Sequence, residues 1–144
     1  MADRAEELGL DVATLSAETT AALKKVVPVF GSTGNPVDIT AQGLVDPSLM
    51  RESLKILLAD PNVHIAAVWL AFTEKEADAT VQSFVEAKAQ TEKPFVVSWV
   101  AIPDHALAKL RSHGIAVLRG AEAAVDACAA LVRYGAGAAE LVCR

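Results

Sequence analysis

The chain has 144 residues, of which 53% are hydrophobic and 22% are charged, and its net charge is −5. This composition excludes a disordered chain, and the length fits one domain with a sizeable core. The acidic balance argues against a nucleic-acid partner, because binding to a phosphate backbone needs a surplus of Lys and Arg. No apolar run reaches the roughly 18 residues of a membrane span.

Cysteine and histidine usage narrows the class of protein further. Two cysteines, Cys128 and Cys143, make no disulfide framework, and Cys128 lies on an apolar helix stripe typical of a core residue. The chain opens without a signal-peptide pattern, so we expect it in the reducing cytoplasm. None of the three histidines has a Cys or carboxylate at metal spacing, so we expect no metal site.

The first part of the chain predicts two helices followed by a long loop. Ala2–Leu8 is helical in composition, and Gly9 stands where a glycine ends a helix. Asp11–Leu15 is either a short strand or merely extended chain. Ser16 is a helix cap, and Pro28 is expected to end the second helix.

Short apolar runs alternate with helices from Asp46 onward, where an Asp-Pro pair is a strong helix start. Ile65–Phe72 is apolar without alternation, as is typical of a strand covered on both faces. Thr73–Glu76 has the pattern of a capping box. The remaining predicted elements are strands at Pro94–Val100 and Ile115–Leu118 and helices at Asp104–His113 and Ala121–Tyr134.

This alternation is typical of right-handed βαβ units, so we expect one three-layer α/β domain with a parallel sheet. Ligands of such sheets bind beyond the carboxyl ends of the strands. Phe72 and Thr73 follow the first predicted strand at a helix start, where N–H groups and the helix dipole favour an anion. The alternatives are that Thr73 only caps its helix and that Arg119, after the third strand, is only a solvated side chain, which is the commoner case for a surface arginine.

The loop Pro28–Val45 is a second candidate site, since long loops inside compact domains are usually functional or disordered. Asn35 precedes Pro36, which favours an extended backbone with the amide side chain outward. In an extended segment Asp38 and Thr40 share one face. The alternative is an Asx-turn in which these polar groups only pin the loop.

Two glycines in the same loop, Gly31 and Gly34, would let the backbone approach a partner closely. Other nucleotide motifs are missing, since no Gly-x-Gly-x-x-Gly follows a strand and no Gly-Lys-Ser/Thr occurs. The first predicted strand is not followed by an aspartate, which argues against a phospho-accepting receiver domain.

The segment Gly34–Thr40 resembles the Asn-Pro-Val-Asp-Leu-Thr motif of the NDP-forming acyl-CoA synthetases. This family includes ADP-forming acetate–CoA ligase and is related to succinyl-CoA synthetase. Leu15–Thr19 resembles the family's Leu-Ser-x-x-Thr helix start, and Leu57–Val63 with the following strand also fits. The resemblance extends from Ala2 to Tyr134.

The resemblance implies a flavodoxin-like ligase domain that works with a CoA-binding domain, a second flavodoxin-like domain and an ATP-grasp domain. The parent enzyme interconverts acyl-CoA, phosphate and ADP with carboxylate, CoA and ATP through an acyl phosphate and a phosphohistidine. Its cofactors are CoA and ATP or ADP with Mg, none of them bound by this chain alone. Position by position, the acyl and phosphate site falls on Asn35, Asp38, Thr40, Phe72 and Thr73.

The chain departs from the family pattern at three places. Ala71-Phe72 replaces the Gly-Gly pair of succinyl-CoA synthetase, no histidine matches the phosphohistidine, and the family's first strand would precede Ala2. We therefore expect residues 1–144 to be a single domain of a larger enzyme, inactive alone. The alternative is a non-catalytic flavodoxin-like binding or scaffold module.

A flavodoxin-like sheet has the strand order 2-1-3-4-5, so without its first strand Ile65–Phe72 would lie at an edge. No lysine or proline in this run discourages pairing, and such edges recruit other strands. Either Val12–Leu15 shifts into the vacant place or a second copy of the chain pairs there. We expect self-association into a homo-oligomer, because Val12–Leu15 is too short to cover the edge.

Overall fold

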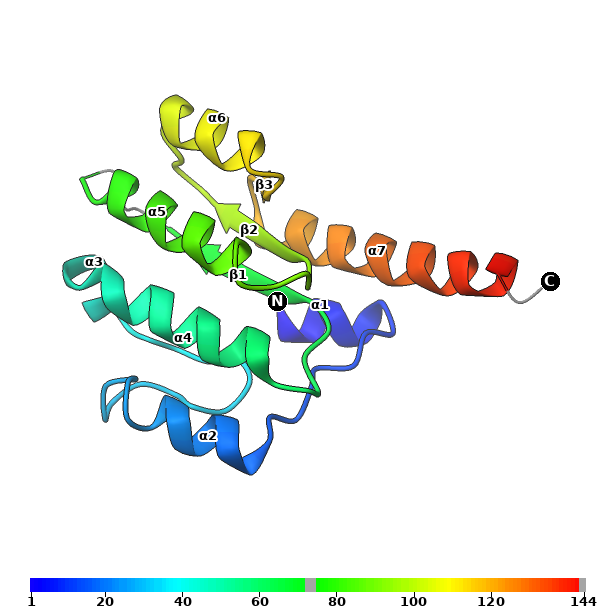
Figure 1. Cartoon of the computed structure of the whole chain (residues 1–144), viewed down its shortest axis with the longest axis horizontal. Helices are drawn as coiled ribbons and strands as arrows, with labels where there is room; N and C mark the ends of the chain where they lie inside the picture. Colours follow the sequence, from blue (N-terminus) through cyan, green and yellow to red (C-terminus); the bar gives the residue numbers. More distant parts are fainter. Residues whose placement is uncertain (72–74, 143–144) are drawn as a thin grey trace.

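The computed structural model describes residues 1–71 and 75–142, with residues 44 and 136–142 described by their backbone only. Helices and strands alternate along most of the chain (Figure 1). The elements are α1 (Ala2–Glu7), α2 (Ala17–Leu23), α3 (Gln42–Val45), α4 (Pro47–Ala59), β1 (Ala66–Leu70), α5 (Ala77–Lys88), β2 (Phe95–Trp99), α6 (Asp104–Ser112), β3 (Ala116–Leu118) and α7 (Ala121–Val142).

The three strands form one parallel sheet in the order β1-β2-β3. Val68 of β1 lies opposite Val97 of β2, which lies opposite Val117 of β3. The chain is therefore an α/β domain with an open parallel sheet, as the alternation of apolar runs predicted. Within the described residues β1 is an edge strand, which confirms that part of the sequence prediction.

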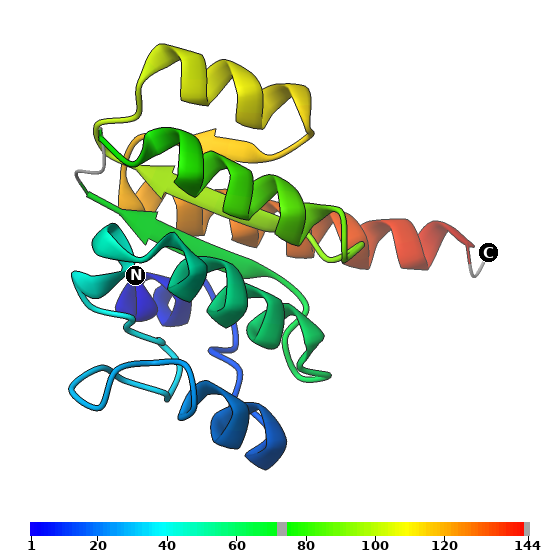
Figure 2. The same cartoon turned by 60° about the vertical axis from the view of Figure 1, so that its left-hand side comes forward.

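Helices cover the two faces of the sheet in separate layers (Figure 2). The larger hydrophobic cluster lies between the sheet and α4, α5 and α6, and includes Phe84, Trp99 and Leu110, each fully buried. A smaller cluster on the other face joins Val96 to Cys128 of α7, and α1 packs against α7. Cys128 is a core residue, and burial raises the pKa of its thiol.

Local capping signals set the helix starts. The Ser16 side chain accepts a hydrogen bond from the backbone N–H of Thr19 at 3.1 Å and begins α2. The Asp46 carboxylate accepts one from the N–H of Ser48 at 2.9 Å, with Pro47 in the first turn of α4. Both caps were predicted from the sequence. Among the described residues no helix is long and apolar enough to cross a membrane.

Three predicted boundaries were wrong. α2 ends at Leu23, well before Pro28. The predicted long loop contains the short helix α3, whose first turn is fixed when the hydroxyl oxygen of Thr40 accepts a hydrogen bond from the N–H of Gln42 at 3.2 Å. α5 begins at Ala77 with Glu76 as its N-cap, so Glu76 is not the third helical residue that the capping box required.

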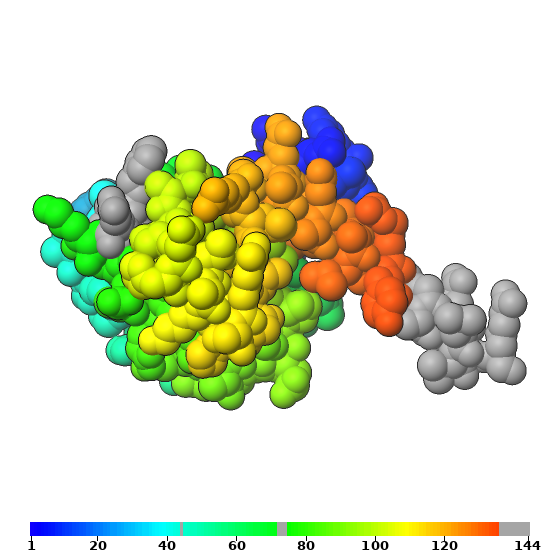
Figure 3. Space-filling view, turned by 90° about the horizontal axis from the view of Figure 1, so that it is seen from above, coloured from blue at the N-terminus to red at the C-terminus, as the bar shows by residue number. Residues whose placement is uncertain are grey.

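The last helix also differs from its prediction, because α7 continues to Val142. Its last turns extend beyond the sheet (Figure 1), and Figure 3 shows the coloured part of α7 beside α1. Leu131 and Val132, two apolar residues of this helix, are 41% and 47% exposed. The helix has run past the short strands at this point, so the sheet no longer covers its apolar stripe.

The sequence of Asp11–Leu15 forms no strand and is extended chain without a sheet partner. The buried end of α4 holds it in place. The Asp60 carboxylate accepts hydrogen bonds from the N–H of Ser16 at 2.9 Å and of Asn62 at 2.8 Å. The Asn62 amide in turn donates to the carbonyl of Thr14 at 2.9 Å.

Asp60 is almost completely buried, with 1% of its surface exposed. Burial raises the pKa of its carboxyl group, but hydrogen bonds from Thr19, Ser16 and Asn62 outweigh that effect and lower the pKa to about 2. The group is thus a buried anion that joins the end of α4 to the start of α2.

Candidate functional site

A groove of about 1630 Å³ runs along the outer edge of β1. Side chains of α4 form one wall, those of α1 and α7 form the other, and the chain from Leu10 to Thr14 closes the far side. The loop from Asn35 to Ala41 borders the groove together with Leu70 and Ala71, at the carboxyl end of β1. The groove thus brings the predicted Asn-Pro-Val-Asp loop to the carboxyl edge of the sheet.

Backbone and side-chain hydrogen bonds hold this loop. Ser32 and Asp38 exchange two backbone hydrogen bonds of 3.0 Å each. The Asn35 amide nitrogen donates to the carbonyl of Ala13 at 3.0 Å. The Asp38 carboxylate accepts a hydrogen bond from the N–H of Thr40 at 2.7 Å, which is an Asx-turn.

The geometry corrects two details of the sequence prediction. Thr40 has a φ of 62°, a left-handed conformation that ends the extended run, so Asp38 and Thr40 do not share a face by strand alternation. Asn35 is exposed as expected, but its amide is tied to Ala13 rather than held free. The two apolar residues, Val37 and Ile39, are half-buried and line the groove.

The environments of the two loop glycines, Gly31 and Gly34, are set by contacts within the loop and its neighbouring residues. A Cβ at Gly31 would overlap the carbonyl oxygen of Asp38 and come within 2.8 Å of the Val27 side chain. A Cβ at Gly34 would meet only the Ser32 hydroxyl at 3.9 Å. The close approach predicted at Gly31 is therefore internal to the chain, and Gly34 makes none.

The loop keeps polar groups that a ligand can use. Asn35 has a second amide N–H, and the Thr40 hydroxyl, which accepts from Gln42, retains its proton for donation. Asp38 uses one carboxylate oxygen within the loop and has the other for an acceptor role. These groups can orient a carboxylate, phosphate or amide.

Phe72 and Thr73, the other predicted site residues, lie outside the described residues. Their neighbour Ala71 borders the groove. Farther along the carboxyl edge, the Arg119 guanidinium lies 4.0 Å from the Asp104 carboxylate, and its side chain is 65% exposed. Arg119 is therefore an exposed surface arginine, which was one of the two interpretations of this residue from the sequence.

One polar contact at the same edge was not predicted from the sequence. His105 Nε2 lies 3.4 Å from an Asp78 carboxylate oxygen, and both side chains are exposed. Each residue lies in the first turn of a helix that follows one of two adjacent strands. The shared position of Asp78 and His105 in these first turns could have indicated the contact, but only if the order of the strands in the sheet had been known.

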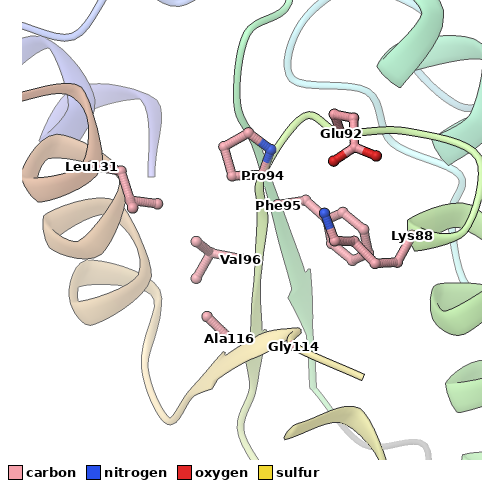
Figure 4. A pocket seen from close by; sticks show the side chains of 8 residues that line it. All are labelled: Lys88, Glu92, Pro94, Phe95, Val96, Gly114, Ala116 and Leu131. Atoms are coloured by element: carbon pink, nitrogen blue, oxygen red, sulfur yellow. The ribbon is translucent and has the colours of Figure 1, made fainter. Parts of the chain in front are cut away.

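A small cavity of about 200 Å³ lies at the opposite, amino edge of the sheet (Figure 4). Pro94 and Gly114, just before β2 and β3, mark that edge, and Lys88 and Glu92 are the charged side chains of its lining. The other lining residues are apolar: Phe95, Val96, Ala116 and Leu131. The cavity is on the wrong side of the sheet for the ligand position of open α/β domains.

Among the side chains that the structure describes, no group of three or more His, Cys, Asp and Glu could hold a metal ion. The parallel open sheet with a polar loop at its carboxyl edge places the chain in the class of open α/β domains, whose ligands generally bind at that edge.

The chain belongs to the Ligase-CoA domain family, whose model matches residues 1–142. This match confirms the resemblance to acyl-CoA synthetases inferred from the Asn-Pro-Val-Asp loop. Trans-feruloyl-CoA synthase FCS1, from an unknown prokaryotic organism, is 39% identical over 61 residues, which are 42% of this chain and 9% of that protein.

Solved structures share the fold. The chain is similar to PH0766 from Pyrococcus horikoshii OT3, with a TM-score of 0.78 and 27% identity over 91% of this chain and 31% of that one. It is also similar to a dinucleotide forming acetyl-coenzyme A synthetase 1 from Ca. Korarchaeum cryptofilum, in its apo form, with a TM-score of 0.79 and 27% identity. That match covers 92% of this chain and 30% of the synthetase.

The same synthetase in complex with phosphate and ADP matches with a TM-score of 0.74, over 92% of this chain and 29% of the synthetase. The chain thus spans about a third of the length of these structural relatives.

Proposed function

We propose that this chain supplies one wall of the acyl and phosphate site of an NDP-forming acyl-CoA synthetase. The complete enzyme interconverts acyl-CoA, phosphate and ADP with carboxylate, CoA and ATP, through an acyl phosphate and a phosphohistidine. The observation that carries the proposal is the place of the Asn35–Thr40 loop, beside the carboxyl end of β1 at the mouth of the groove.

The proposed roles follow from the groups that the loop keeps available. Asn35 and Thr40 donate hydrogen bonds to an oxyanion of the acyl phosphate, while Asp38 holds the backbone of Thr40 in place. Phe72 and Thr73, which follow β1 in the sequence, complete the site. The phosphohistidine, CoA and the Mg–nucleotide come from the CoA-binding and ATP-grasp domains of the same enzyme.

The relatives support this assignment through what their names state. One matching synthetase forms acetyl-coenzyme A and was solved with phosphate and ADP, and the matching synthase forms feruloyl-CoA. Because the chain spans about a third of its structural relatives, the remaining activities are assigned to other domains. Residues 1–144 alone are therefore expected to form no acyl-CoA.

The test uses the complete enzyme with Asn35→Ala or Asp38→Ala. We expect kcat to fall at least tenfold, because each change removes a polar group at the site, while Tm falls by no more than a few degrees. Ser32→Ala is the control, since Ser32 contributes to the loop only through its backbone bonds to Asp38. Steady-state kinetics and thermal melts are measured on the same preparations.

If Tm and activity fall together in Asn35→Ala and Asp38→Ala, the loop is only structural. The scaffold-module alternative then accounts for the chain better. Measurable acyl-CoA formation by residues 1–144 alone would also contradict the proposal, since it would mean that the phosphoryl relay lies within this chain.

A further inference from the structure

Two large apolar side chains lie at the tip of a tight turn in the long loop. The N–H of Gly31 donates to the carbonyl of Pro28 at 2.8 Å, so Val29 and Phe30 occupy the two central positions of a β-turn. Such positions usually hold Gly, Pro, Asn, Asp or Ser. Val29 is fully exposed and Phe30 is 71% exposed. Neither side chain is therefore explained by packing within the described residues.

Contacts on either side hold this Pro28–Gly31 turn in one conformation. Val27, directly before the turn, is 5% exposed and anchors it to the interior. Gly31, at its end, lies so close to the Asp38 carbonyl that no Cβ fits there. Ser32 then exchanges its two backbone hydrogen bonds with Asp38. Because the backbone is already ordered, a partner that binds the turn pays little conformational entropy.

The turn and the candidate site are two parts of one hairpin. The Ser32–Asp38 pairing joins the chain that leaves the turn to the chain that carries Asp38 and Thr40. This hairpin lies at the end of the molecule toward which the strands point (Figure 2). Asn35, Asp38 and Thr40 line the groove, whereas the two residues at the tip of the turn do not. The hairpin thus has polar groups at the groove and an apolar tip outside it.

The position of the tip decides among the possible partners. Adjacent exposed apolar side chains on an ordered segment are typical of protein–protein contacts. If this chain forms one wall of a site, another domain forms the opposite wall, and the structural relatives are about three times as long as this chain. A second copy would supply the same wall again. The net charge of −5 disfavours an anionic membrane surface.

We propose that the Pro28–Gly31 turn inserts into an apolar pocket of the neighbouring domain that forms the opposite wall of the acyl and phosphate site. This inference rests on the proposed function. Phe30 is the anchor, because buried aromatic side chains contribute most to the binding energy of interfaces. Through the Ser32–Asp38 pairing, the docked turn fixes the distance between the Asn35–Thr40 loop and the opposite wall.

Photocrosslinking tests the contact directly. The complete enzyme is prepared with Phe30→p-benzoylphenylalanine and irradiated without substrate. We expect crosslinks to peptides outside residues 1–144 of the same enzyme molecule. The matched control is Tyr134→p-benzoylphenylalanine, since Tyr134 is an aromatic residue of α7 that is 78% exposed. Its yield of such crosslinks should be at least tenfold lower.

Loss of the anchor should affect catalysis without affecting folding. In the complete enzyme, Phe30→Ser should lower kcat/KM at least tenfold, because small displacements between two walls of a site are costly. The same change should alter Tm of residues 1–144 by less than about 2 °C, since Phe30 is exposed there. Phe30→Tyr keeps the ring and should retain kcat/KM within about threefold. Tyr134→Ser is the control and should leave kcat/KM unchanged.

Three results would overturn the proposal. Crosslinks from position 30 could reach only a second copy, which would make the turn a dimer contact. Their yield could equal that from position 134, which would mean that the turn stays in solvent. Phe30→Ser could also keep full activity.

The docking proposal and the proposed function fail separately, because crosslinks are measured without turnover. Crosslinks to a neighbouring domain, combined with full activity of Asn35→Ala and Asp38→Ala, would keep the contact and reject the assigned site. Inactive Asn35→Ala and Asp38→Ala variants of unchanged Tm, combined with no crosslink from position 30, would keep the site and reject the contact.

Discussion

β1 and β2 are neighbouring five-residue strands of similar apolar composition, yet their environments differ. Every residue of β2 is buried, whereas β1 leaves Ala67 exposed and Trp69 53% exposed. β2 is paired on both sides and packed on both faces, while β1 has one partner. The sequence of Ile65–Phe72 is suited to a strand covered on both faces, so that prediction was wrong for the domain as it stands.

The difference shows that an apolar run indicates a strand suited to burial on both faces. Whether both faces are in fact covered depends on the topology of the sheet. Strands of parallel sheets are normally buried on both faces, whereas β1 is buried on one face only. Local sequence and surroundings therefore agree in β2 and disagree in β1. The following predictions test how far this contrast extends.

The largest effect is expected from the two tryptophans, one on each strand. Trp99→Ala should lower the free energy of unfolding by about 3–5 kcal/mol, because Trp99 is completely buried. Trp69→Ala should lower it by less than about 1 kcal/mol. Urea denaturation of both variants measures the contrast. Equal losses would mean that the edge of β1 is covered in solution.

Asp60 holds the far wall of the groove and should have the next largest effect. Asp60→Ala leaves the N–H groups of Ser16 and Asn62 without their acceptor, so we expect a loss of about 2–4 kcal/mol. The surface change Asp3→Ala should have little effect and serves as the control. Denaturation at pH 7 compares the two variants.

The pH dependence of Asp60 follows from its lowered pKa. The pKa of the folded state, about 2, lies below the ordinary value of 3.8, so the carboxylate contributes stability above about pH 4. That contribution is lost as the pH falls from about 4 to about 2. A titration of unfolding free energy should show this loss in the wild type and a weaker one in Asp60→Asn. Parallel curves would contradict the assignment.

The smallest effect is expected in the loop at the mouth of the groove. Gly31→Ala would push a Cβ into the Asp38 carbonyl, so we expect a loss of about 1–3 kcal/mol. Gly34→Ala meets no close neighbour and should change stability by less than about 0.5 kcal/mol. Thermal melts distinguish them, and equal effects would mean that the Ser32–Asp38 pairing does not hold in solution.

Those parts of the fold that depend on local signals could be predicted. Ser16 and Asp46 begin helices through bonds to residues two or three positions ahead, and the apolar runs located all three strands. The left-handed φ of Thr40 and the early end of α2 at Leu23 could not be predicted, because no residue type at these positions indicates the backbone conformation found there.

The candidate site was predicted only in part for a similar reason. The place of the Asn35–Thr40 loop followed from its motif, but the bond from Asn35 to Ala13 joins residues far apart in the chain. The pair of His105 with Asp78 likewise requires knowing that two helix starts are adjacent. Side-chain partners across elements follow from topology, which a linear pattern does not contain.

Within the described residues all three strands lie between Ala66 and Leu118, and the first 45 residues contribute little to the two hydrophobic clusters. Their main anchors are Leu23, Val27 and the hydrogen bonds to Asp60. Segments with few buried apolar contacts open at a lower free energy than the core. Amides of α2 should therefore exchange through local unfolding, ahead of those in β2, and the Asn35–Thr40 loop belongs to the part of the domain that opens first.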